Sequence, residues 1–329
     1  CSWLIRLGAR VSGIGFLPNN NKRLFDSLNL KNKIKYTNID VREFKKLSNF
    51  IKQNKPSIIF HLAAQPIVSY SYKDPLTTFD INFRGTLNLL ECCRNLNYVK
   101  SIVLITSDKC YENIGKSKSY SENDKLGGVD PYSASKALAE FAIRSYRKTI
   151  YKNKNCGISS ARAGNVIGGG DWSKDRLVPD AIRFILRKDL IKLRNPNFNR
   201  PWQFILEPLM GYLILGKKQY ENSSKYSSAW NFGPRSENIK TVKEVVKMVI
   251  KNWGEGKIKQ SNKKNFKEHQ HLQLNINKAK KYLNWAPIYN IRKSITETVL
   301  WYYKVLREKE NPIDVTNYQI DKYMKEFRG

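Results

Sequence analysis

The stretch that decides the fold is SIVLITSDKC, at residues 101–110. Its first six residues form an apolar run that predicts a strand covered on both faces, as in a parallel sheet. Further along the chain, residues 131–151 have the spacing of a long amphipathic helix, and residues 157–161 form another apolar strand pattern. A strand, a helix and a second strand in this order predict a parallel sheet with helices on its faces.

The same alternation extends toward the start of the chain. Strands are expected at residues 10–16, 35–39 and 57–62, and helices at 43–53 and 75–94. This order predicts an α/β fold with a Rossmann-type doubly wound parallel sheet.

Beyond residue 171 the pattern loosens and predicts a smaller α/β region that binds the substrate. Helices are expected there at residues 178–187, 242–253 and 291–307, and strands at 230–232 and, as a short edge strand in a polar loop, within 257–267. Such a region would pack against the carboxyl ends of the strands, where doubly wound sheets bind their ligands.

The composition is that of a folded protein with an unusual charge. Its 329 residues are 41% hydrophobic, and 59 Lys and Arg against 28 Asp and Glu give a formal net charge of +31. A basic nucleic-acid-binding protein is one alternative that this charge raises. Lysine is spread through every segment together with asparagine, which favours a solvated basic surface. We therefore expect no nucleic-acid partner, and the charge itself has no physical explanation.

Membrane and disulfide classes are excluded on similar grounds. No apolar run approaches the length of a membrane span, so no membrane partner is expected. Five cysteines are an odd number and contain no C-x-x-C pair, which argues against a zinc site and against a disulfide framework. No metal is expected, and the default location is a reducing cytoplasm.

The candidate chemistry lies at Tyr132, Lys136 and the cluster Ser107, Asp108 and Lys109. Tyr132 and Lys136 are four residues apart on a helix and share one face. A neighbouring ammonium favours the phenolate of a tyrosine and lowers its pKa toward a usable base. Taken alone, a Tyr and Lys at this spacing are more often a solvated helix face, so the pair needs context.

Longer motifs supply that context. They are FHLAAQP at 60–66, NFRGT at 82–86, TSDKCYEN at 106–113, LGGVDPYSASK at 126–136, ARAGNVIGGGDW at 161–172, RNP at 194–196, RPWQ at 200–203 and WNFGP at 230–234. With these motifs the chain resembles the extended short-chain dehydrogenase/reductase family, and within it the nucleotide-sugar 4,6-dehydratases. The dTDP-glucose members typically carry Asp-Glu where Asp108 and Lys109 stand, and this exchange points to the CDP-glucose branch.

The resemblance implies an enzyme, a hydro-lyase that binds NAD and uses CDP-glucose as its small-molecule substrate. The product would be CDP-4-dehydro-6-deoxy-D-glucose, used in deoxysugar synthesis for polysaccharides such as the O-antigen of lipopolysaccharide. Residues 1–170 would be the NAD-binding domain and residues 171–329 mainly the nucleotide-sugar-binding region.

The resemblance also assigns catalytic roles. Tyr132 would take the proton of the sugar 4-hydroxyl, Lys136 would hold the nicotinamide ribose, and Ser107 would hydrogen-bond the 4-oxygen. Asp108 is the candidate acid for the departing 6-hydroxyl. Lys109 is the candidate base at C5, directly or through a water, which requires a neutral amine and therefore burial or a nearby cation.

For the cofactor, the resemblance implies contacts from Asp40, Leu62, Ala63, Ala64, Tyr132 and Lys136. Asp40 would read the adenine, although a helix cap before residues 41–43 is the alternative. The family's glycine-rich turn and its first strand are absent from the sequence, which begins with Cys1 where the last glycine of that turn is expected. No acidic residue stands after residues 10–14 for the adenosine ribose, so the choice of NAD rests on the family.

For the substrate, the resemblance implies contacts from Asn165, Arg176, Arg200, Gln203 and Glu268. Asn165 would lie near the diphosphate, and the two arginines would supply cations whose fork suits phosphate. Trp202 is expected either to pack in the core or to stack on the nucleobase.

Alternatives stay open at this point. A nucleotide-sugar 4-epimerase, or another nucleotide-sugar dehydratase of the same fold, would use Tyr132 and Lys136 alike, but an epimerase has no need of Asp108 and Lys109. A truncated homologue without activity is another possibility, because loss of the first strand would expose two strand edges. By analogy, the helices at 75–94 and 131–151 would form the interface of a homodimer or higher homo-oligomer.

Overall fold

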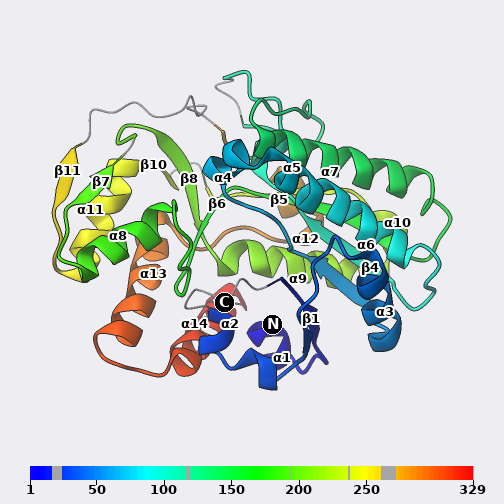
Figure 1. The fold of residues 1–329 in the computed structure, drawn as a ribbon, viewed down its shortest axis with the longest axis horizontal. Coiled ribbons are helices and arrows are strands. Elements are labelled where there is room, and N and C mark those ends of the chain that lie inside the picture. Colours follow the sequence, from blue (N-terminus) through cyan, green and yellow to red (C-terminus); the bar gives the residue numbers. More distant parts are fainter. Residues whose placement is uncertain (17–23, 116–118, 194, 236–237, 261–271, 329) are drawn as a thin grey trace.

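A computed structural model describes residues 1–16, 24–115, 119–193, 195–235, 238–260 and 272–328. Its main sheet has four parallel strands in the order β3 (Ile58–His61), β4 (Ser101–Ile105), β5 (Gly157–Ala163) and β9 (Ala229–Phe232). The sheet runs through the right-hand half of the molecule in Figure 1. Crossover connections between parallel neighbours confirm the predicted doubly wound α/β class.

Two further strands form a separate parallel pair, β1 (Ser12–Ile14) and β2 (Lys35–Thr37). Among the described residues no ladder joins β1 to β3, so the parallel sheet is in two pieces. The β1–β2 pair stays attached through α3 (Phe44–Asn54), which packs on α6 (Gly85–Cys93).

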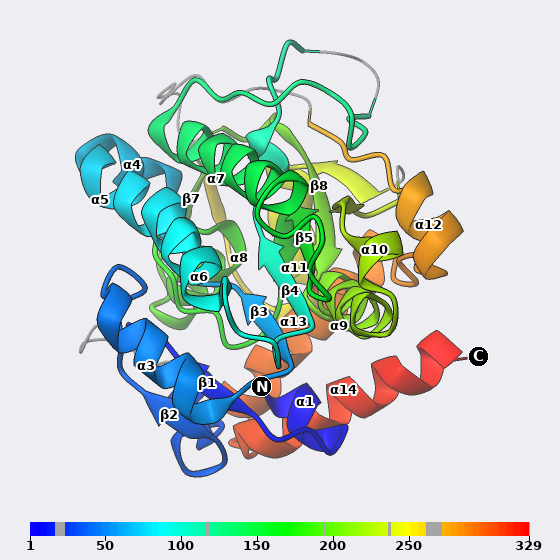
Figure 2. The same cartoon turned by 90° about the vertical axis from the view of Figure 1, so that its right-hand side faces the viewer.

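Helices cover both faces of the main sheet. On one face lie α6 and α7 (Pro131–Lys148), while α9 (Leu206–Glu221) crosses the other face, as Figure 2 shows. Buried apolar side chains of α3, α6 and α7, among them Leu47, Leu90 and Ile143, meet the strands in one core. The helices α10 (Ser223–Tyr226) and α12 (Asn277–Leu283) flank α9.

The helix predicted at residues 75–94 is interrupted. It begins as α5 (Pro75–Phe79), continues as the π-helix η2 (Asp80–Arg84) and ends as α6. The short helix α4 (Val68–Lys73) precedes it. A π-turn inserts one extra residue into the helical ladder and often marks a functional position. Here it carries the buried Asn82 toward the site described below.

The sequence analysis did not predict α9. Pro208, Gly211 and Gly216 lie within it, and proline and glycine argue against a helix. The glycines have a packing reason: a Cβ on Gly211 would lie 2.3 Å from Phe232 Cδ1, so the helix can approach the sheet only without that side chain. Tertiary packing therefore overrides local propensity in this segment.

The smaller region lies on the left of Figure 1. It contains the sheet β10 (Ile239–Thr241), β8 (Asn199–Phe204) and β6 (Asn165–Ile167), and the pair β11 (Ile258–Gln260) and β7 (Ile191–Leu193). Its helices are α8 (Leu177–Leu186), α11 (Val242–Trp253) and α13 (Ile291–Leu306), which confirm the three helices predicted there. The edge strand expected within 257–267 is β11, and residues 261–267 lie outside the described part.

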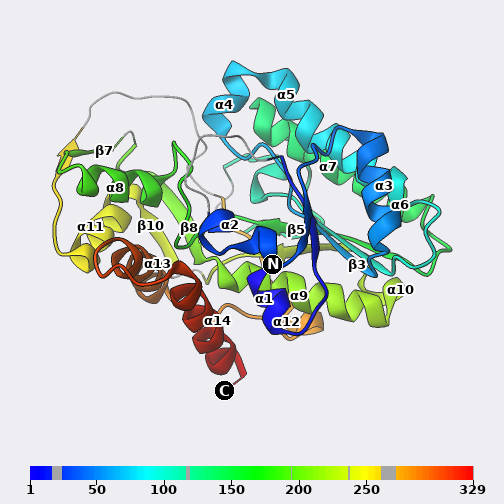
Figure 3. The same ribbon diagram turned by 60° about the horizontal axis from the view of Figure 1, so that its bottom comes forward.

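The C-terminal helix α14 (Pro312–Arg328) was not predicted either. It packs along α1 (Ser2–Arg6) at the bottom of the molecule, as Figure 3 shows, where Arg6 pairs with Asp321 and Trp3 meets the Tyr323 ring edge to face. Two short elements, α2 (Leu24–Ser27) and η1 (Leu30–Asn32), connect β1 to β2. In the described part of the chain no helix is both long and apolar enough to span a membrane.

Candidate functional site

The first turn of α7 presents Tyr132 and Lys136. Asp130 caps this helix by accepting a hydrogen bond from the Ser133 amide at 3.0 Å, and Pro131 occupies the first helical position. Tyr132 is 8% exposed and Lys136 is 4% exposed, so the pair is buried against the sheet and the solvated-face alternative is wrong.

The second component is the 3₁₀ turn η3 (Asp108–Cys110), which directly follows β4. Ser107 caps the turn through Lys109 N at 3.2 Å, and its hydroxyl donates to Asp108 Oδ1 at 3.0 Å. The Ser107 hydroxyl also hydrogen-bonds the Tyr132 side chain and lowers its pKa. The structure therefore brings Ser107, Asp108 and Tyr132 together at the carboxyl edge of the sheet, as predicted, and places Lys109 half-buried in the same turn.

Burial governs the protonation of the pair on α7. Loss of solvent raises the pKa of Tyr132 to about 12, and the hydrogen bond from Ser107 offsets this only in part. Burial also lowers the pKa of Lys136 to about 8, and its Nζ lies 3.4 Å from the Ile105 carbonyl oxygen. The sequence analysis expected Lys136 to lower the pKa of Tyr132. The pKa is raised instead, because desolvation of the phenolate is the larger effect.

Asp108 is a buried carboxyl, only 6% exposed. Desolvation raises its pKa, although Lys109, Ser107 and Arg200 each favour the charged form. The position depends on a glycine: a Cβ at Gly164 would lie 2.9 Å from Asp108 Oδ2. A carboxyl that holds its proton to a higher pH than usual is suited to act as a general acid.

A polar network lies behind Tyr132. Asn82 in the π-turn accepts from Gln65 N at 2.8 Å and donates to Ser135 Oγ at 2.9 Å. The Ser135 hydroxyl donates to the Tyr132 carbonyl at 2.7 Å, and the Tyr132 amide donates to Ser71 Oγ at 3.2 Å. The loop after β3 is thereby fixed to the start of α7, and the π-turn supplies the connecting amide.

The predicted cofactor residues fall into two groups. Leu62, Ala63 and Ala64 follow β3, and Leu62 is 54% exposed. Asp40 follows β2 and lines a pocket of about 520 Å³ together with Phe16, Arg42, Glu43 and Asp80.

Asp40 is already engaged within its own loop. Its carboxylate accepts from Arg42 N at 2.9 Å and from Arg42 Nη2 at 2.7 Å, so it closes a turn and an ion pair. The guanidinium lowers the pKa of Asp40. The helix-cap alternative is wrong, because the N-cap residue of α3 is Glu43, and the Asp40 carboxylate instead closes a turn around Arg42 and still borders the pocket.

The predicted substrate residues lie around β6, β8 and the loop before α8. Arg176 Nη1 lies 3.5 Å from Asp171 Oδ2, and Arg200 Nη1 donates to the Asn199 carbonyl at 2.9 Å. Asn165 is half-buried at the start of β6. Glu268 lies outside the described residues.

Gln203 is buried on β8, where its Nε2 donates to the Phe232 carbonyl at 3.0 Å and its Oε1 has no hydrogen-bond partner among the described residues. Its neighbour Trp202 belongs to the apolar core with Ile182 and Val249, which is the packing alternative.

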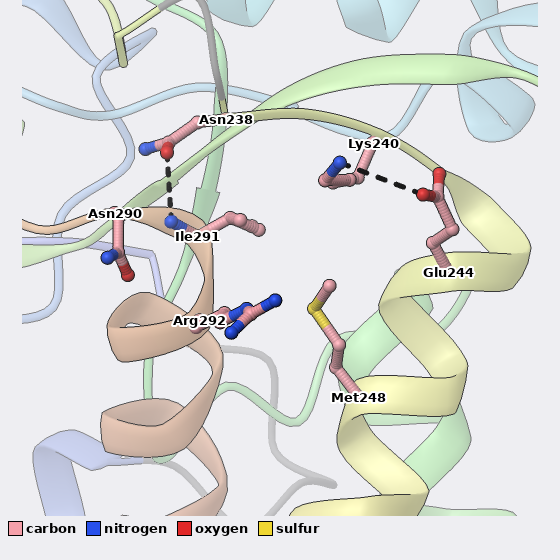
Figure 4. Close-up of a pocket in the computed structure, with 7 residues that line it drawn as sticks. All are labelled: Asn238, Lys240, Glu244, Met248, Asn290, Ile291 and Arg292. Atoms are coloured by element: carbon pink, nitrogen blue, oxygen red, sulfur yellow. Dashed lines mark hydrogen bonds and ion pairs between the residues drawn. The ribbon is translucent and has the colours of Figure 1, made fainter.

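A second pocket, of about 370 Å³, lies in the smaller region between β10, α11 and α13, as Figure 4 shows. Asn238, Lys240, Glu244 and Arg292 line it with amide and charged groups, and Lys240 pairs with Glu244 at 3.7 Å. None of the predicted site residues lines this pocket. Its position beside β10 places it away from the Tyr132 and Asp108 cluster.

Sequence reasoning missed the buried ion pair of Glu140 and Arg162, whose Oε2 and Nη2 are 2.6 Å apart. Glu140 lies one turn beyond Lys136 on α7, and Arg162 lies within β5. An arginine inside an otherwise uncharged strand pattern, and an acid on the buried face of α7, are the signals that could have found it.

Fold and site together define a class: dinucleotide-dependent enzymes of the short-chain dehydrogenase/reductase type. Over the described residues no group of three or more His, Cys, Asp or Glu is placed to hold a metal ion, and the five cysteines are unpaired. The comparison with known families narrows the class. The chain belongs to the GDP-mannose 4,6 dehydratase family, whose family model matches residues 1–298.

Individual relatives agree with this assignment. The chain is 38% identical to the CDP-glucose 4,6-dehydratase of Salmonella typhimurium over 328 residues, covering 98% of this chain and 91% of the relative. It is 27% identical to the UDP-glucuronate 4-epimerase of Thermodesulfobacterium geofontis over 279 residues, covering 81% and 79% of the two chains.

Solved structures share the fold. The UDP-glucose 4-epimerase of Thermotoga maritima, in complex with UDP-glucose, matches with a TM-score of 0.78 at 19% identity, covering 92% of this chain and 94% of that chain. The dTDP-glucose 4,6-dehydratase of Bacillus anthracis, in complex with NAD, matches with a TM-score of 0.70 at 24% identity, covering 85% and 83%.

Proposed function

We propose that this chain converts CDP-D-glucose to CDP-4-dehydro-6-deoxy-D-glucose and water, with NAD as its cofactor. The observation that carries the proposal is the buried Asp108 carboxyl, whose pKa is raised by burial and which lies beside Ser107 and Tyr132. Elimination of water needs an acid for the departing hydroxyl, and an epimerisation at C4 does not. The identity of 38% to a CDP-glucose 4,6-dehydratase supports the choice of substrate.

The first half of the proposed reaction takes place at C4 of the sugar. NAD, when bound, supplies a hydride acceptor for C4 and afterwards a hydride donor for C6, with no net consumption. Tyr132 accepts the proton of the 4-hydroxyl, and the Ser107 hydroxyl orients the 4-oxygen. Because burial raises the pKa of Tyr132 to about 12, its phenolate needs a stabilising charge, which we assign to the buried Lys136 ammonium.

The second half removes water across C5 and C6. The ketone at C4 acidifies the hydrogen on C5, and Lys109 takes this proton directly or through a water and would return a proton to C5 when C6 receives the hydride. Asp108 protonates the 6-hydroxyl as it leaves. Both residues lie in one short turn, so a base and an acid reach adjacent carbon atoms from the same side of the site.

The residues present fit the two ends of the dinucleotide. The pocket of about 520 Å³ beside Asp40 has room for the adenosine, and Phe16 at its edge offers an aromatic surface. At the other end, we assign the nicotinamide ribose to Lys136. Leu62, Ala63 and Ala64 would line the path between them after β3.

For the nucleotide sugar we propose Asn165, Arg176, Arg200, Gln203 and Glu268 as contacts. Arg176 and Arg200 would pair with the diphosphate, and the influence of Arg200 on Asp108 supports their closeness to the reaction centre. The unpartnered Gln203 Oε1 would accept a donor of the ligand. The division into a cofactor part, residues 1–170, and a part that is mainly substrate-binding, residues 171–329, belongs to the same proposal; β9 and α9 in the second part complete the main sheet and its cover.

We further propose a homodimer or higher homo-oligomer that pairs the helical segment 75–94, which comprises α5, η2 and α6, and the helix α7 between chains. The exposed side chains of Phe141, 49%, and Leu138, 38%, on α7 support this, because a partner would cover them. A reducing compartment such as the cytoplasm is also proposed, and the unpaired buried cysteines support it.

The test is incubation of the purified chain with NAD⁺ and CDP-glucose, with product detected by mass spectrometry as loss of one water. The dTDP-, GDP- and UDP-glucose substrates are tested in parallel, together with a version that carries an added N-terminal strand and glycine-rich turn. We expect the dehydrated product from CDP-glucose and little from the other three. A sugar epimerised at C4 without loss of water would support the epimerase alternative, and no product from either version would refute the proposal.

A further inference from the structure

The buried ion pair of Glu140 and Arg162 is hydrogen-bonded to residues on both sides of the candidate catalytic turn. Their side chains are 3% and 4% exposed, so both charges are taken out of water. Each carboxylate oxygen of Glu140 accepts further bonds: Oε1 from Thr106 Oγ1 at 2.5 Å, and Oε2 from Ser160 Oγ at 2.8 Å. Desolvation of such a pair is costly, and these hydrogen bonds offset part of that cost, although Arg162 Nε has no hydrogen-bond partner among the described residues.

The pair contacts the catalytic turn at both ends. Thr106, which bonds to Glu140, is the residue before Ser107, and Tyr111, whose hydroxyl accepts from Arg162 Nη1 at 2.7 Å, is the residue after Cys110. Arg162 also lies over the Tyr111 ring, 4.9 Å from its centroid. Residues 107–110 are thus held between two anchors that meet in one ion pair.

The same pair also fixes the helix that carries the other half of the site. Glu140 lies four residues beyond Lys136, which lies four beyond Tyr132, so the three side chains share one face of α7. The charge of Glu140 favours the protonated form of Lys136. Through Arg162, this face is tied to β5, next to the strand from which the turn departs.

We propose that Glu140 and Arg162 are positioning residues: they clamp the turn 107–110 at Thr106 and Tyr111 and so set its distance from Tyr132 and Lys136. The catalytic consequence rests on the proposed function. Neither side chain touches substrate; the pair acts through the placement of Ser107 and Asp108. A misplacement of about 1 Å in a catalytic group can lower a rate by roughly 100-fold, so the clamp should be visible in kcat.

Direct removal of Glu140 or Arg162 leaves an unpaired buried charge and risks unfolding. The test therefore removes the links. Thr106→Val deletes the link to Glu140, and Thr106→Ser keeps the hydroxyl. Tyr111→Phe deletes the link to Arg162 together with the bond that the Tyr111 hydroxyl donates to Asn231 Oδ1 at 2.8 Å. Ser160→Ala is the matched control, because it deletes a bond to the same carboxylate from a strand that does not lead into the turn.

For Thr106→Val and Tyr111→Phe we expect kcat to fall at least about tenfold, with the substrate KM and the NAD⁺ Kd within about twofold of wild type. Thr106→Ser should restore most of kcat, and Ser160→Ala should retain it at a similar urea midpoint. If Ser160→Ala loses as much kcat as the two anchor variants, or if they lose none, the clamp is refuted.

A second readout separates this inference from the proposed reaction. Hydrogen exchange of the Lys109 and Cys110 amides should be faster in both anchor variants than in wild type and in Ser160→Ala, whether or not CDP-glucose is turned over. Unchanged exchange would overturn the clamp. Absence of product from the wild-type chain, with exchange as expected, would overturn the proposed function alone.

Discussion

Asp108→Asn tests the proposed acid with the least disturbance of the site. Asparagine has nearly the same shape, and its Oδ1 can still accept the hydrogen bond that Ser107 now donates to Asp108 at 3.0 Å. It also fits beside Gly164, where the carboxyl leaves no space for a larger group. The substitution therefore removes a transferable proton and little else.

The size of the effect follows from that role. General acid catalysis contributes about 10²–10⁴-fold, which corresponds to about 2.7–5.5 kcal/mol of activation free energy. Elimination of water should slow by this amount, while oxidation at C4 continues. In a rapid-mixing assay with CDP-glucose, absorbance of the reduced nicotinamide should therefore accumulate in the variant and stay low in wild type.

The pH dependence gives an independent check. Because burial raises the pKa of Asp108, the acid is present at low pH and is lost as the pH rises through that value. Wild-type kcat should fall as the pH rises through the pKa of Asp108. The pH profile of Asp108→Asn should show no such alkaline fall. Dehydration at the wild-type rate by the variant, or an unchanged alkaline limb, would refute the assignment of Asp108 as the acid.

Three further predictions concern other residues. Lys109→Met should abolish exchange of the C5 hydrogen with solvent deuterium, measured by NMR, and full-rate elimination in this variant would exclude Lys109 as the base. Gly164→Ala places a Cβ 2.9 Å from Asp108 Oδ2 and should lower kcat about tenfold, with a near-unchanged NAD⁺ Kd by titration calorimetry. Glu207 is buried with a pKa raised to about 7 from 4.5, so it contributes stability that is fully present below pH 4.5 and is lost as the pH rises through about 7, roughly 3 kcal/mol in all. Glu207→Gln should flatten the pH dependence of the free energy of unfolding, measured by urea denaturation between about pH 5 and pH 8. An equally steep pH dependence in the variant would contradict this role of Glu207.

The sequence predicted those parts of the fold in which local pattern and tertiary packing agree. The strand at 101–106 and the helix from Pro131 follow from an apolar run and from helical spacing, and the structure confirms them. The helix α9 could not be predicted, because Pro208 and Gly211 contradict it locally and only contact with the sheet explains them.

In the candidate site too, some features follow from the local sequence and others only from tertiary contacts. Tyr132 and Lys136 share a helix face by spacing alone, and a strand end brings Ser107 to them. The partners of Asp40 and the link from Glu140 to Arg162 depend on residues that meet only after folding. The Tyr132 pKa was also beyond a pattern argument, because its direction is set by the extent of burial rather than by the neighbouring charge.

The separation of β1 and β2 from the main sheet has a thermodynamic consequence. Among the described residues no ladder joins these two short strands to another sheet, so the pair is expected to open locally at a lower free energy than the sheet around β4. The proposed dinucleotide would reach from the Asp40 pocket beside this strand pair to Lys136 on α7, and would therefore contact both the strand pair and the main sheet. Each tenfold excess of NAD over its Kd would then add about 1.4 kcal/mol to the joined state, so the cofactor would act as a structural tie between two cooperative units as well as a hydride carrier.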